Sequence, residues 1–218
     1  SSNVTVGMHG GSVVAAADNT FGIRGKQNVV VDITGGTISS ATNRLAMYVS
    51  GDQDGAIQLN ISGGVIENEG QAIQAYSGAV INVSGDAYIH SKSGTGISTQ
   101  SGYGVVELNV TGGTIVTDNG TYGVQAREKS QVNISGGTIT GRTAVWASDQ
   151  TTVNISGGTL DGTTAAVGKG SSGAPSITVT GGTFSHDVKD YVPAGMSTEQ
   201  DANGNFVVKP VTTIYVGG

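Results

Sequence analysis

The stretch VNISGGTI at residues 132–139 returns almost unchanged as VNISGGTL at residues 153–160. Further copies of the pattern lie at residues 31–38, 59–66, 108–115 and 177–184, with degenerate versions leading to Gly10-Gly11 and Gly85-Asp86. From the first copy to the eighth, the corner glycine moves 171 residues in seven steps, so the repeat averages about 24 residues. The step length varies while the core pattern does not, which indicates loops of variable length on a constant frame.

Each copy predicts three short strands. The alternation Val153-Asn154-Ile155 is typical of a strand with two side chains facing inward. The Gly-Gly pair then turns the chain, because glycine accepts a positive φ and a close backbone approach. A second strand begins directly after the pair, and a third follows, centred on one apolar residue such as Val145. Three strands and three corners per repeat predict an all-β, right-handed parallel β-helix of about eight coils, in which stacking buries columns of Val, Ile and Leu.

The composition excludes several other classes of protein. Glycine makes up 37 of the 218 residues, but collagen needs it at every third position with abundant proline, and the chain has three prolines. The net charge of -6 argues against a nucleic-acid partner. No run of about 18 apolar residues occurs, so we expect no membrane span. The absence of cysteine excludes a disulfide scaffold and a thiolate zinc site.

Asparagine recurs at one outward position of the first strand, with Asp32 and Thr178 in the equivalent places of two other copies. The positions are Asn60, Asn82, Asn109, Asn133 and Asn154. Each lies in an N-x-S/T sequon, so glycosylation is one interpretation of the pattern. A ladder of stacked polar side chains along one face of the rod explains the regular recurrence better, and we expect that structural role.

The repeat VNISGGTI, followed by a later Ala-Val strand, resembles the pectate-lyase-like right-handed β-helix domains of Gram-positive cell-surface and adhesin proteins of the gut-commensal type. The segment 181–195 looks like the part that closes such domains, with Phe184, Val188 and Tyr191 covering the last coil. We expect coils over residues 1–183, a capping segment with a hairpin over 184–209, and a linker or following module over 210–218. The resemblance implies a secreted or wall-associated protein with flanking modules, often with an adhesive or glycan-binding role.

One outward face carries the candidate binding residues. In each third strand, the first and third residues after the inward apolar residue point outward. When the coils stack, each of these two positions forms a column along the rod, and the two columns are rich in Tyr, Trp, Gln and Arg. Aromatic rings stack on the C–H faces of sugars, while Gln and Arg bind hydroxyl and carboxylate groups. Long loops at 50–58, 99–107 and 168–176 project from the edge of the same face. The expected glycan-binding residues are Arg24, Tyr48, Gln74, Tyr76, Gln100, Tyr103, Gln125, Arg127, Trp146 and Asp149.

The signals for catalysis and metal binding are weak. The chain has no G-x-S-x-G, H-E-x-x-H or P-loop motif, and its three histidines fall in different coils. Asp52-Gln53-Asp54-Gly55 resembles the start of a calcium loop but lacks the closing Glu, so Asp52 and Asp54 are minor candidates for calcium. We otherwise expect no cofactor. A glycosidase would need two carboxylates close together, but the acids are scattered over two corners. Glu67 and Glu69 flank one turn, where a solvated edge is the simpler interpretation. We therefore expect no catalytic residue.

The sequence therefore predicts an extracellular bacterial surface domain that binds a glycan or glycoprotein of host, mucus or plant origin. Two alternatives stay open. One is a carbohydrate-active enzyme, either a polysaccharide lyase or a glycoside hydrolase, which would release new reducing ends or unsaturated products. The other is a passive spacer, in which aromatic and Gln side chains simply tolerate an exposed strand, and a glycan array without hits would favour it.

Overall fold

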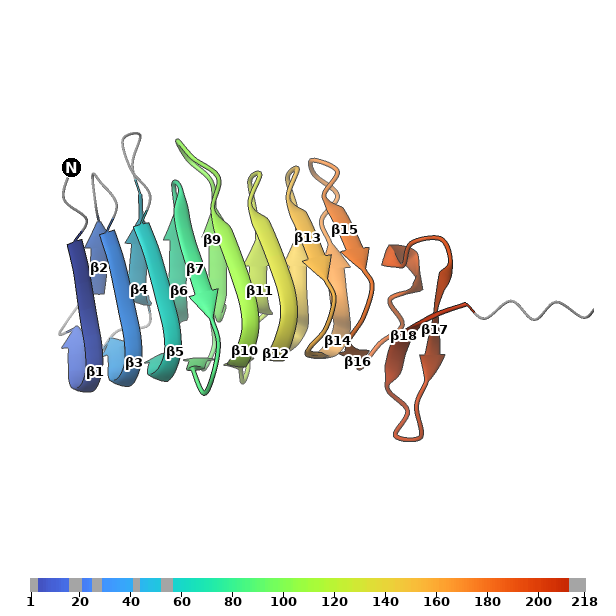
Figure 1. The fold of residues 1–218 in the computed structure, drawn as a ribbon, viewed down its shortest axis with the longest axis horizontal. Coiled ribbons are helices and arrows are strands. Elements are labelled where there is room, and N and C mark those ends of the chain that lie inside the picture. Colours follow the sequence, from blue (N-terminus) through green and yellow to red (C-terminus); the bar gives the residue numbers. More distant parts are fainter. Residues whose placement is uncertain (1–3, 16–20, 25–28, 41–43, 52–56, 212–218) are drawn as a thin grey trace, which may run out of the picture.

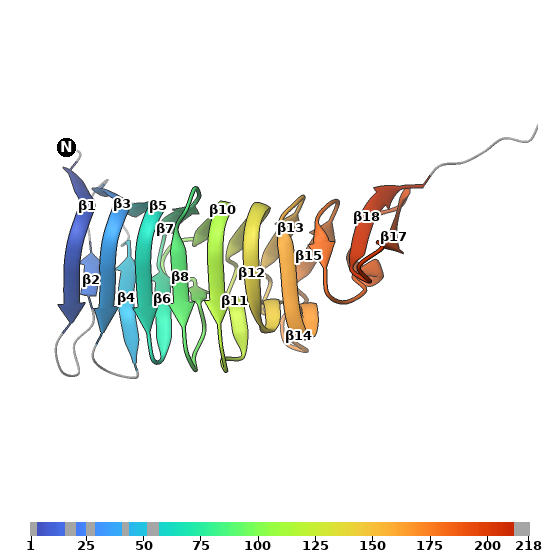
Figure 2. The same cartoon turned by 90° about the horizontal axis from the view of Figure 1, so that it is seen from below.

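The computed structural model describes residues 4–15, 21–24, 29–40, 44–51 and 57–211, with the strand at 21–24 described through its backbone alone. These residues form an elongated rod of stacked coils that ends in a small hairpin (Figures 1 and 2). The fold is all-β and is a right-handed parallel β-helix, as the repeat predicts. In the described ranges the one helical element is the short 3₁₀ turn η1 (Lys189–Tyr191).

The strands differ in length because some corners continue the extended backbone and others interrupt it. In chain order they are β1 (Val4–Ala15), β2 (Phe21–Arg24), β3 (Val29–Ser40), β4 (Leu45–Ser50), β5 (Ile57–Asn68), β6 (Gln71–Tyr76), β7 (Ala79–Val83), β8 (Tyr88–Ser91), β9 (Ile97–Gln100), β10 (Glu107–Thr117), β11 (Tyr122–Ala126), β12 (Gln131–Ala147), β13 (Thr152–Ile155), β14 (Thr159–Lys169), β15 (Ser176–Val179), β16 (Thr183–Phe184), β17 (Met196–Gln200) and β18 (Phe206–Pro210). The 17 residues of β12 pass through all three sides of one coil.

Three parallel sheets run along the rod, one for each strand of the repeat. The first-strand sheet pairs β1, β3, β5, β7, β10, β12, β13 and β15 in that order. The third-strand sheet pairs β2, β4, β6, β9, β11, β12 and β14. The described residues thus form about seven turns, not the eight expected. The reason is that the eighth repeat supplies a first and a second strand and then enters the hairpin region instead of a third strand.

The core consists of columns of inward side chains. Val110, Ile134 and Ile155 lie in register in three successive coils, and each is 1% exposed. Full burial of a side chain of this size contributes roughly 1.5–3 kcal/mol. Because each inward residue packs on its counterparts in the coils on either side, the columns make the stability of one coil depend on its neighbours.

The Gly-Gly corners need glycine for two separate reasons. Gly137 has a φ of 79°, in the left-handed region that residues with a side chain rarely adopt. In addition, a Cβ atom on Gly137 would lie 2.7 Å from the carbonyl oxygen of Gly112 in the preceding coil. The corners therefore stack backbone directly on backbone, which explains why the glycine pair returns in nearly every repeat.

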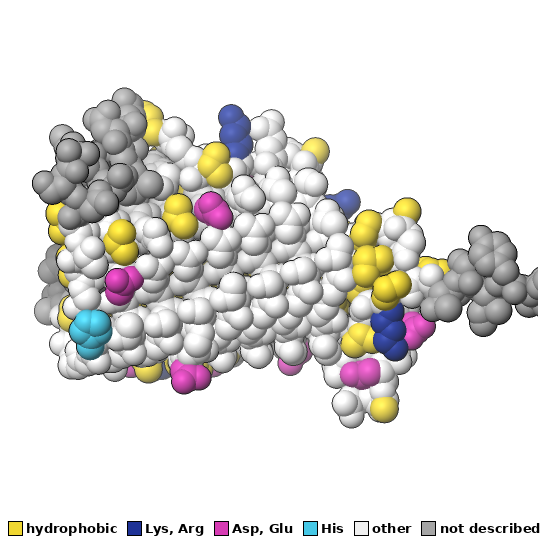
Figure 3. All heavy atoms as spheres, in the orientation of Figure 1, with side chains coloured by type: hydrophobic (Ala, Val, Ile, Leu, Met, Phe, Trp, Pro, Cys, Tyr) yellow, Lys and Arg dark blue, Asp and Glu magenta, His cyan; other side chains and the backbone are white. Residues whose placement is uncertain are grey.

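The asparagines form the predicted ladder on the first-strand sheet. Each Nδ2 donates a hydrogen bond to the Oδ1 of the asparagine in the preceding coil, at distances of 2.8–3.0 Å. Asn60 ends the series by donating to Oδ1 of Asp32 at 2.7 Å, and a carboxylate oxygen suits that last place because it accepts a hydrogen bond. Figure 3 shows the surface over these strands as rows of side chains that are mostly neither charged nor hydrophobic. The hydrogen bonds give these side chains a structural role.

The C-terminal end of the rod is covered by a hairpin. β18 pairs antiparallel with both β16 and β17, and residues 201–205 form the turn of this hairpin, which lies within the expected segment 184–209. Phe184 and Val188 are buried in the core, and Tyr191 packs against it, as expected for residues that cover the last coil. The antiparallel pairing of β18 with β16 ends the parallel stacking of the second-strand sheet.

Candidate functional site

The outward column of the third-strand sheet lies in the register that the sequence predicts. Tyr48 pairs with Gln74, and Gln125 pairs with Trp146. Ser98 lies between these two pairs, opposite both glutamines. The aromatic and amide side chains of the column are half-buried and line one continuous face.

Arg24 does not belong to this column. β2 pairs with β4 so that Phe21 lies opposite Met47, which places Arg24 opposite Ser50. The expected register, with Arg24 beside Tyr48, is therefore off by two residues, and Arg24 lies instead in the second outward column, in register with Ser50 and Tyr76. The error arises because the apolar pattern aligns Ile23 with Met47, whereas the pairing places Phe21 opposite Met47 and Ile23 opposite Val49.

Trp146 is less open than a side chain at the centre of a binding face would be. Its ring stacks on Tyr122 of the preceding coil, with centroids 5.1 Å apart and planes at 28°. On the other side, a Cβ atom on Gly170 would lie 2.8 Å from Cζ2 of the indole. Tyr122 therefore belongs to the aromatic surface, and nothing in the sequence singled it out because it lies outside the two outward columns.

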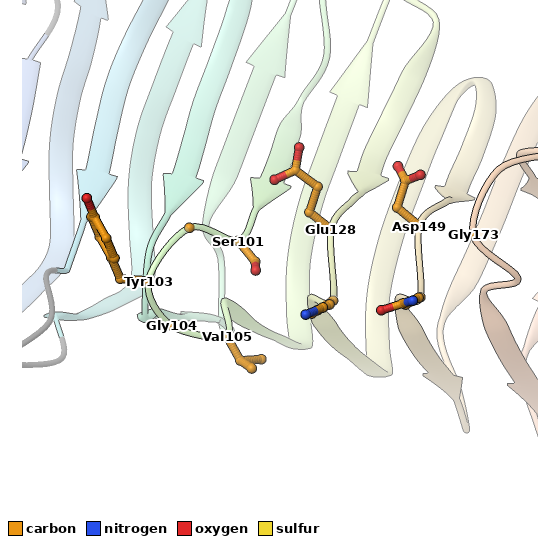
Figure 4. A pocket seen from close by; sticks show the side chains of 10 residues that line it. Ser101, Tyr103, Gly104, Val105, Glu128, Asp149 and Gly173 are labelled. Atoms are coloured by element: carbon orange, nitrogen blue, oxygen red, sulfur yellow. The ribbon is translucent and has the colours of Figure 1, made fainter.

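A pocket of about 590 Å³ opens at the corner beside this sheet, and we call it the corner pocket. Its volume falls within the range of roughly 300–1,000 Å³ that is usual for ligand sites. It is formed by successive loops that each follow a third strand, seen from close by in Figure 4. The lining residues are Ser101, Gly102, Tyr103, Gly104, Val105, Glu128, Lys129, Asp149, Gln150 and Gly173.

Tyr103 and Val105 give the corner pocket an exposed apolar rim. Tyr103 is 75% exposed, the highest value for a large hydrophobic side chain in the described residues, and Val105 is 55% exposed. The loop that carries them is fixed from the preceding coil, because the backbone N–H of Tyr103 donates to Oγ of Ser77 at 3.3 Å. Gly102 packs closely on the ring of Tyr76, so Tyr76 supports this loop from below.

Two tight turns form the wall of the corner pocket, and their backbone is strained. Glu128, Lys129, Asp149 and Gln150 have φ values of 50°, 60°, 55° and 59°. A left-handed backbone costs a residue with a side chain about 1–2 kcal/mol, and turns with two such residues usually contain Asn-Gly or Gly-Gly. In the part of the chain that the structure describes, six residues other than glycine have a positive φ, and four of the six line this pocket.

We expect Gln150→Gly to raise the free energy of unfolding by about 0.5–1 kcal/mol, because glycine adopts the left-handed conformation without strain. The backbone N–H that donates to the Gly173 carbonyl is kept in the variant. Gln131→Gly is the matched control, since Gln131 is also exposed but lies in an extended strand. Urea denaturation should show opposite signs for the two variants, and a loss of stability in both would contradict the assigned strain.

The two carboxylates of the wall are held in place by hydrogen bonds. Nε2 of Gln100 donates to Oε1 of Glu128 at 3.0 Å, which joins the third-strand sheet to the pocket. Oγ of Ser148 donates to Oδ2 of Asp149 at 2.6 Å. Hydrogen bonds from Ser148 and Ser172, together with the charge of Arg127, lower the pKa of Asp149, although desolvation opposes them. Asp149 therefore stays ionised at neutral pH.

The structure brings some of the predicted residues together and leaves others apart. Tyr103 and Asp149 line the corner pocket, and Gln100 adjoins it through its bond to Glu128. Five further lining residues lie in the loops that the sequence predicted at the edge of this face, although none was singled out: Ser101, Gly102, Gly104, Val105 and Gly173. Sequence reasoning missed Glu128, Lys129 and Gln150. Their signal is poor because Glu-Lys and Asp-Gln are not recognised turn dipeptides. Asp52 and Asp54 lie outside the described residues.

Two acids at the corner between the second and third strands take part in ordinary surface pairs. Glu69 pairs with Lys92, and Asp118 lies 3.0 Å from Nε2 of His90. A smaller pocket of about 310 Å³ there includes Asp118, Arg142 and Asp161 in its lining. Within the described ranges, no group of three or more His, Cys, Asp or Glu residues is placed to hold a metal ion.

Comparisons of the chain with protein-family models, with curated proteins and with solved structures gave no match. The fold and the corner pocket are therefore the basis for any functional conclusion. Among the described residues, no helix is long and apolar enough to cross a membrane.

Proposed function

We propose that this β-helix is an extracellular bacterial surface domain that binds carbohydrate at the corner pocket and the adjoining third-strand sheet. The likeness of its repeat to the pectate-lyase-like β-helix domains of Gram-positive surface proteins supports the location. The pocket supports the ligand class, because it combines an exposed aromatic ring with fixed hydrogen-bonding groups. This combination is suited to sugars, which present C–H faces and hydroxyl groups on the same ring.

The observation that carries the proposal is the strain in the pocket wall. Residues held in the left-handed region gather at binding and catalytic sites, where the surrounding structure maintains them. Here the chain keeps Glu128, Lys129, Asp149 and Gln150 at positions where glycine or asparagine would cost less. A passive spacer gains nothing from charged and amide side chains at such positions, whereas a binding site gains the groups that contact its ligand.

The geometry favours a ligand that lies along the rod. Successive loops of the pocket are one coil apart, about 4.8 Å, and the pocket extends from the loop at 101–105 to Gly173. A sugar ring on Tyr103 would therefore be followed by others beside Glu128 and Asp149. The aromatic pair Tyr122 and Trp146 lies on the adjoining sheet, where it can extend the surface for a longer chain.

Glycan-array binding by the intact chain, with titration of the hits, tests the proposal. We expect Tyr103→Ala to weaken binding by about 1–3 kcal/mol, the scale of losing an aromatic anchor, without lowering the melting temperature. Tyr88→Ala is the matched control, because Tyr88 is also exposed, at 38%, but lies in β8 on the second-strand sheet. Trp146→Ala should cost less affinity than Tyr103→Ala, because the indole already stacks on Tyr122. Equal affinities for the Tyr103 and Tyr88 variants would place the site elsewhere.

A glycoside hydrolase is the second candidate, because Glu128 and Asp149 lie on neighbouring coils. Coil spacing of about 4.8 Å is close to the separation of about 5–5.5 Å between the carboxyl groups of retaining enzymes. Such an enzyme pairs an ionised carboxylate, a role that the lowered pKa of Asp149 suits, with a second carboxylic acid whose pKa is raised. Binding stays the first candidate because the exposed aromatic ring and the fixed hydrogen-bonding groups of the pocket serve it without a catalytic acid. New reducing ends after incubation with mucin, pectin or milk glycans would support hydrolysis instead.

A further inference from the structure

The corner pocket carries two carboxylates at equivalent positions of successive coils. Glu128 and Asp149 are each the first of the two left-handed residues in their turn. The turns are joined directly, because the backbone N–H of Lys129 donates to the carbonyl oxygen of Asp149 at 2.9 Å. Figure 4 shows both carboxylates pointing to the same side of the loops, with the hydroxyl of Tyr103 on that side as well.

Neither carboxylate is neutralised by a direct ion pair. The ion pairs within 4.0 Å in the described part of the chain lie elsewhere, at His90–Asp118, Lys92–Glu69, Lys189–Asp187 and Lys209–Glu199. Two cationic side chains are near: Lys129 lines the pocket, and Arg127 acts on Asp149 through its charge. Hydrogen bonds from Gln100 to Glu128, and from Ser148 and Ser172 to Asp149, hold both carboxylates in place.

A ligand beside this wall therefore meets acceptors with negative charge. Sugar hydroxyl groups donate well to ionised carboxylates, and such charge-assisted hydrogen bonds are stronger than neutral ones. A uronate, sialate or sulfate group in contact with the two carboxylates would be repelled by both, because Lys129 and Arg127 lie near but form no direct ion pair with either acid. Such a wall would discriminate between glycans by their charge.

We propose that the corner pocket selects glycans that carry no carboxylate or sulfate group, with Glu128 and Asp149 as the residues that determine this specificity. The inference rests on the proposed carbohydrate-binding function and adds the class of glycan. Tyr103 supplies the stacking contact shared by all ligands, and the two acids lower the affinity for those that carry a negative charge.

Matched pairs of probes test the selectivity in the intact chain. Highly methyl-esterified pectin is compared with its de-esterified product, and lacto-N-tetraose is compared with its sialylated form, by calorimetry at 0.15 M salt. We expect the uncharged member of a bound pair to bind at least about tenfold more tightly. The double variant Glu128→Gln/Asp149→Asn should bring the two affinities within about threefold of each other, and Glu128→Lys should favour the charged member. Tyr88→Ala should leave the ratio unchanged.

The outcomes separate the two proposals. If no member of either pair and no glycan on the array binds, the carbohydrate-binding function fails and this inference fails with it. If glycans bind but the charged members bind as tightly as the uncharged ones, the function stands and the selectivity is wrong. A ratio that persists in the double variant, with its melting temperature unchanged, removes Glu128 and Asp149 from the role.

Discussion

Replacing Ile134 by Asp is expected to lower the free energy of unfolding by at least about 4 kcal/mol, because the change removes a buried side chain and leaves an unpaired carboxylate in its place. Ile134 is 1% exposed and lies in register between Val110 and Ile155. No polar group of these neighbouring side chains can compensate the charge. Thermal unfolding should show a fall of roughly 10 °C or more for a chain of this size.

Two variants at the same place control this experiment. Ile134→Val removes one methylene group and should cost about 0.5–1.5 kcal/mol. Asn133→Ser changes the adjacent outward residue and breaks the hydrogen bonds to Asn109 and from Asn154, which together are worth about 1–2 kcal/mol. A loss for Asn133→Ser as large as that for Ile134→Asp would refute the inward and outward assignment of the strand.

The frame of the rod was predictable from the sequence because one physical pattern repeats in it. Alternating inward and outward residues, such as Ile134 and Asn133, have only one arrangement in which every coil buries its apolar column. The same alternation predicted the asparagine ladder, since identical outward residues in register must stack at the coil spacing. The role of Phe184 as a cover came from the resemblance to β-helix domains, and its ring is buried as that resemblance implies.

The site was predictable only in part, because it depends on the loops and not on the frame. Tyr103 was found through its loop and Asp149 as the start of the turn beyond Trp146, but the turn of Glu128 and Lys129 carries no glycine or asparagine to mark it. Its left-handed backbone is imposed by stacking on the turn of the next coil, a tertiary effect that local propensity does not contain. The place of Arg24 was wrong for a related reason, because the pairing of β2 with β4 fixes the register and apolar spacing alone does not.

The rod and its site are linked through rigidity. The loops of the corner pocket at 101–105, 128–129 and 149–150 begin and end in strands that are paired on both sides, so their ends are fixed relative to the neighbouring coils. The cost of ordering a loop on ligand binding is lower when the loop is already held, as Tyr103 is by Ser77. The strained turns persist for the same reason, since the stack around them is stronger than the strain that they contain.

Gly137→Ala is expected to lower the free energy of unfolding by about 3 kcal/mol, although it adds a single methyl group. One part of the loss is conformational, because Ala at a φ of 79° costs about 1–2 kcal/mol. The other part is steric. The new Cβ would lie 2.7 Å from the carbonyl oxygen of Gly112 and 2.9 Å from that of Gly113, and forcing coils apart in this way costs about 1–3 kcal/mol. Urea denaturation of the intact chain measures the sum.

The first coil offers a control that separates the two parts. Gly11 occupies the same corner with a φ of 82°, but a Cβ atom there meets nothing within 4 Å, because no earlier coil stacks on it in this structure. Gly11→Ala should therefore show the conformational cost alone, about 1 kcal/mol. Gly10→Ala should be nearly neutral, since Gly10 has neither a positive φ nor a close neighbour. If Gly11→Ala and Gly137→Ala cost the same, backbone conformation alone explains the glycine corners, and the close stacking of one coil on the next is not what requires them.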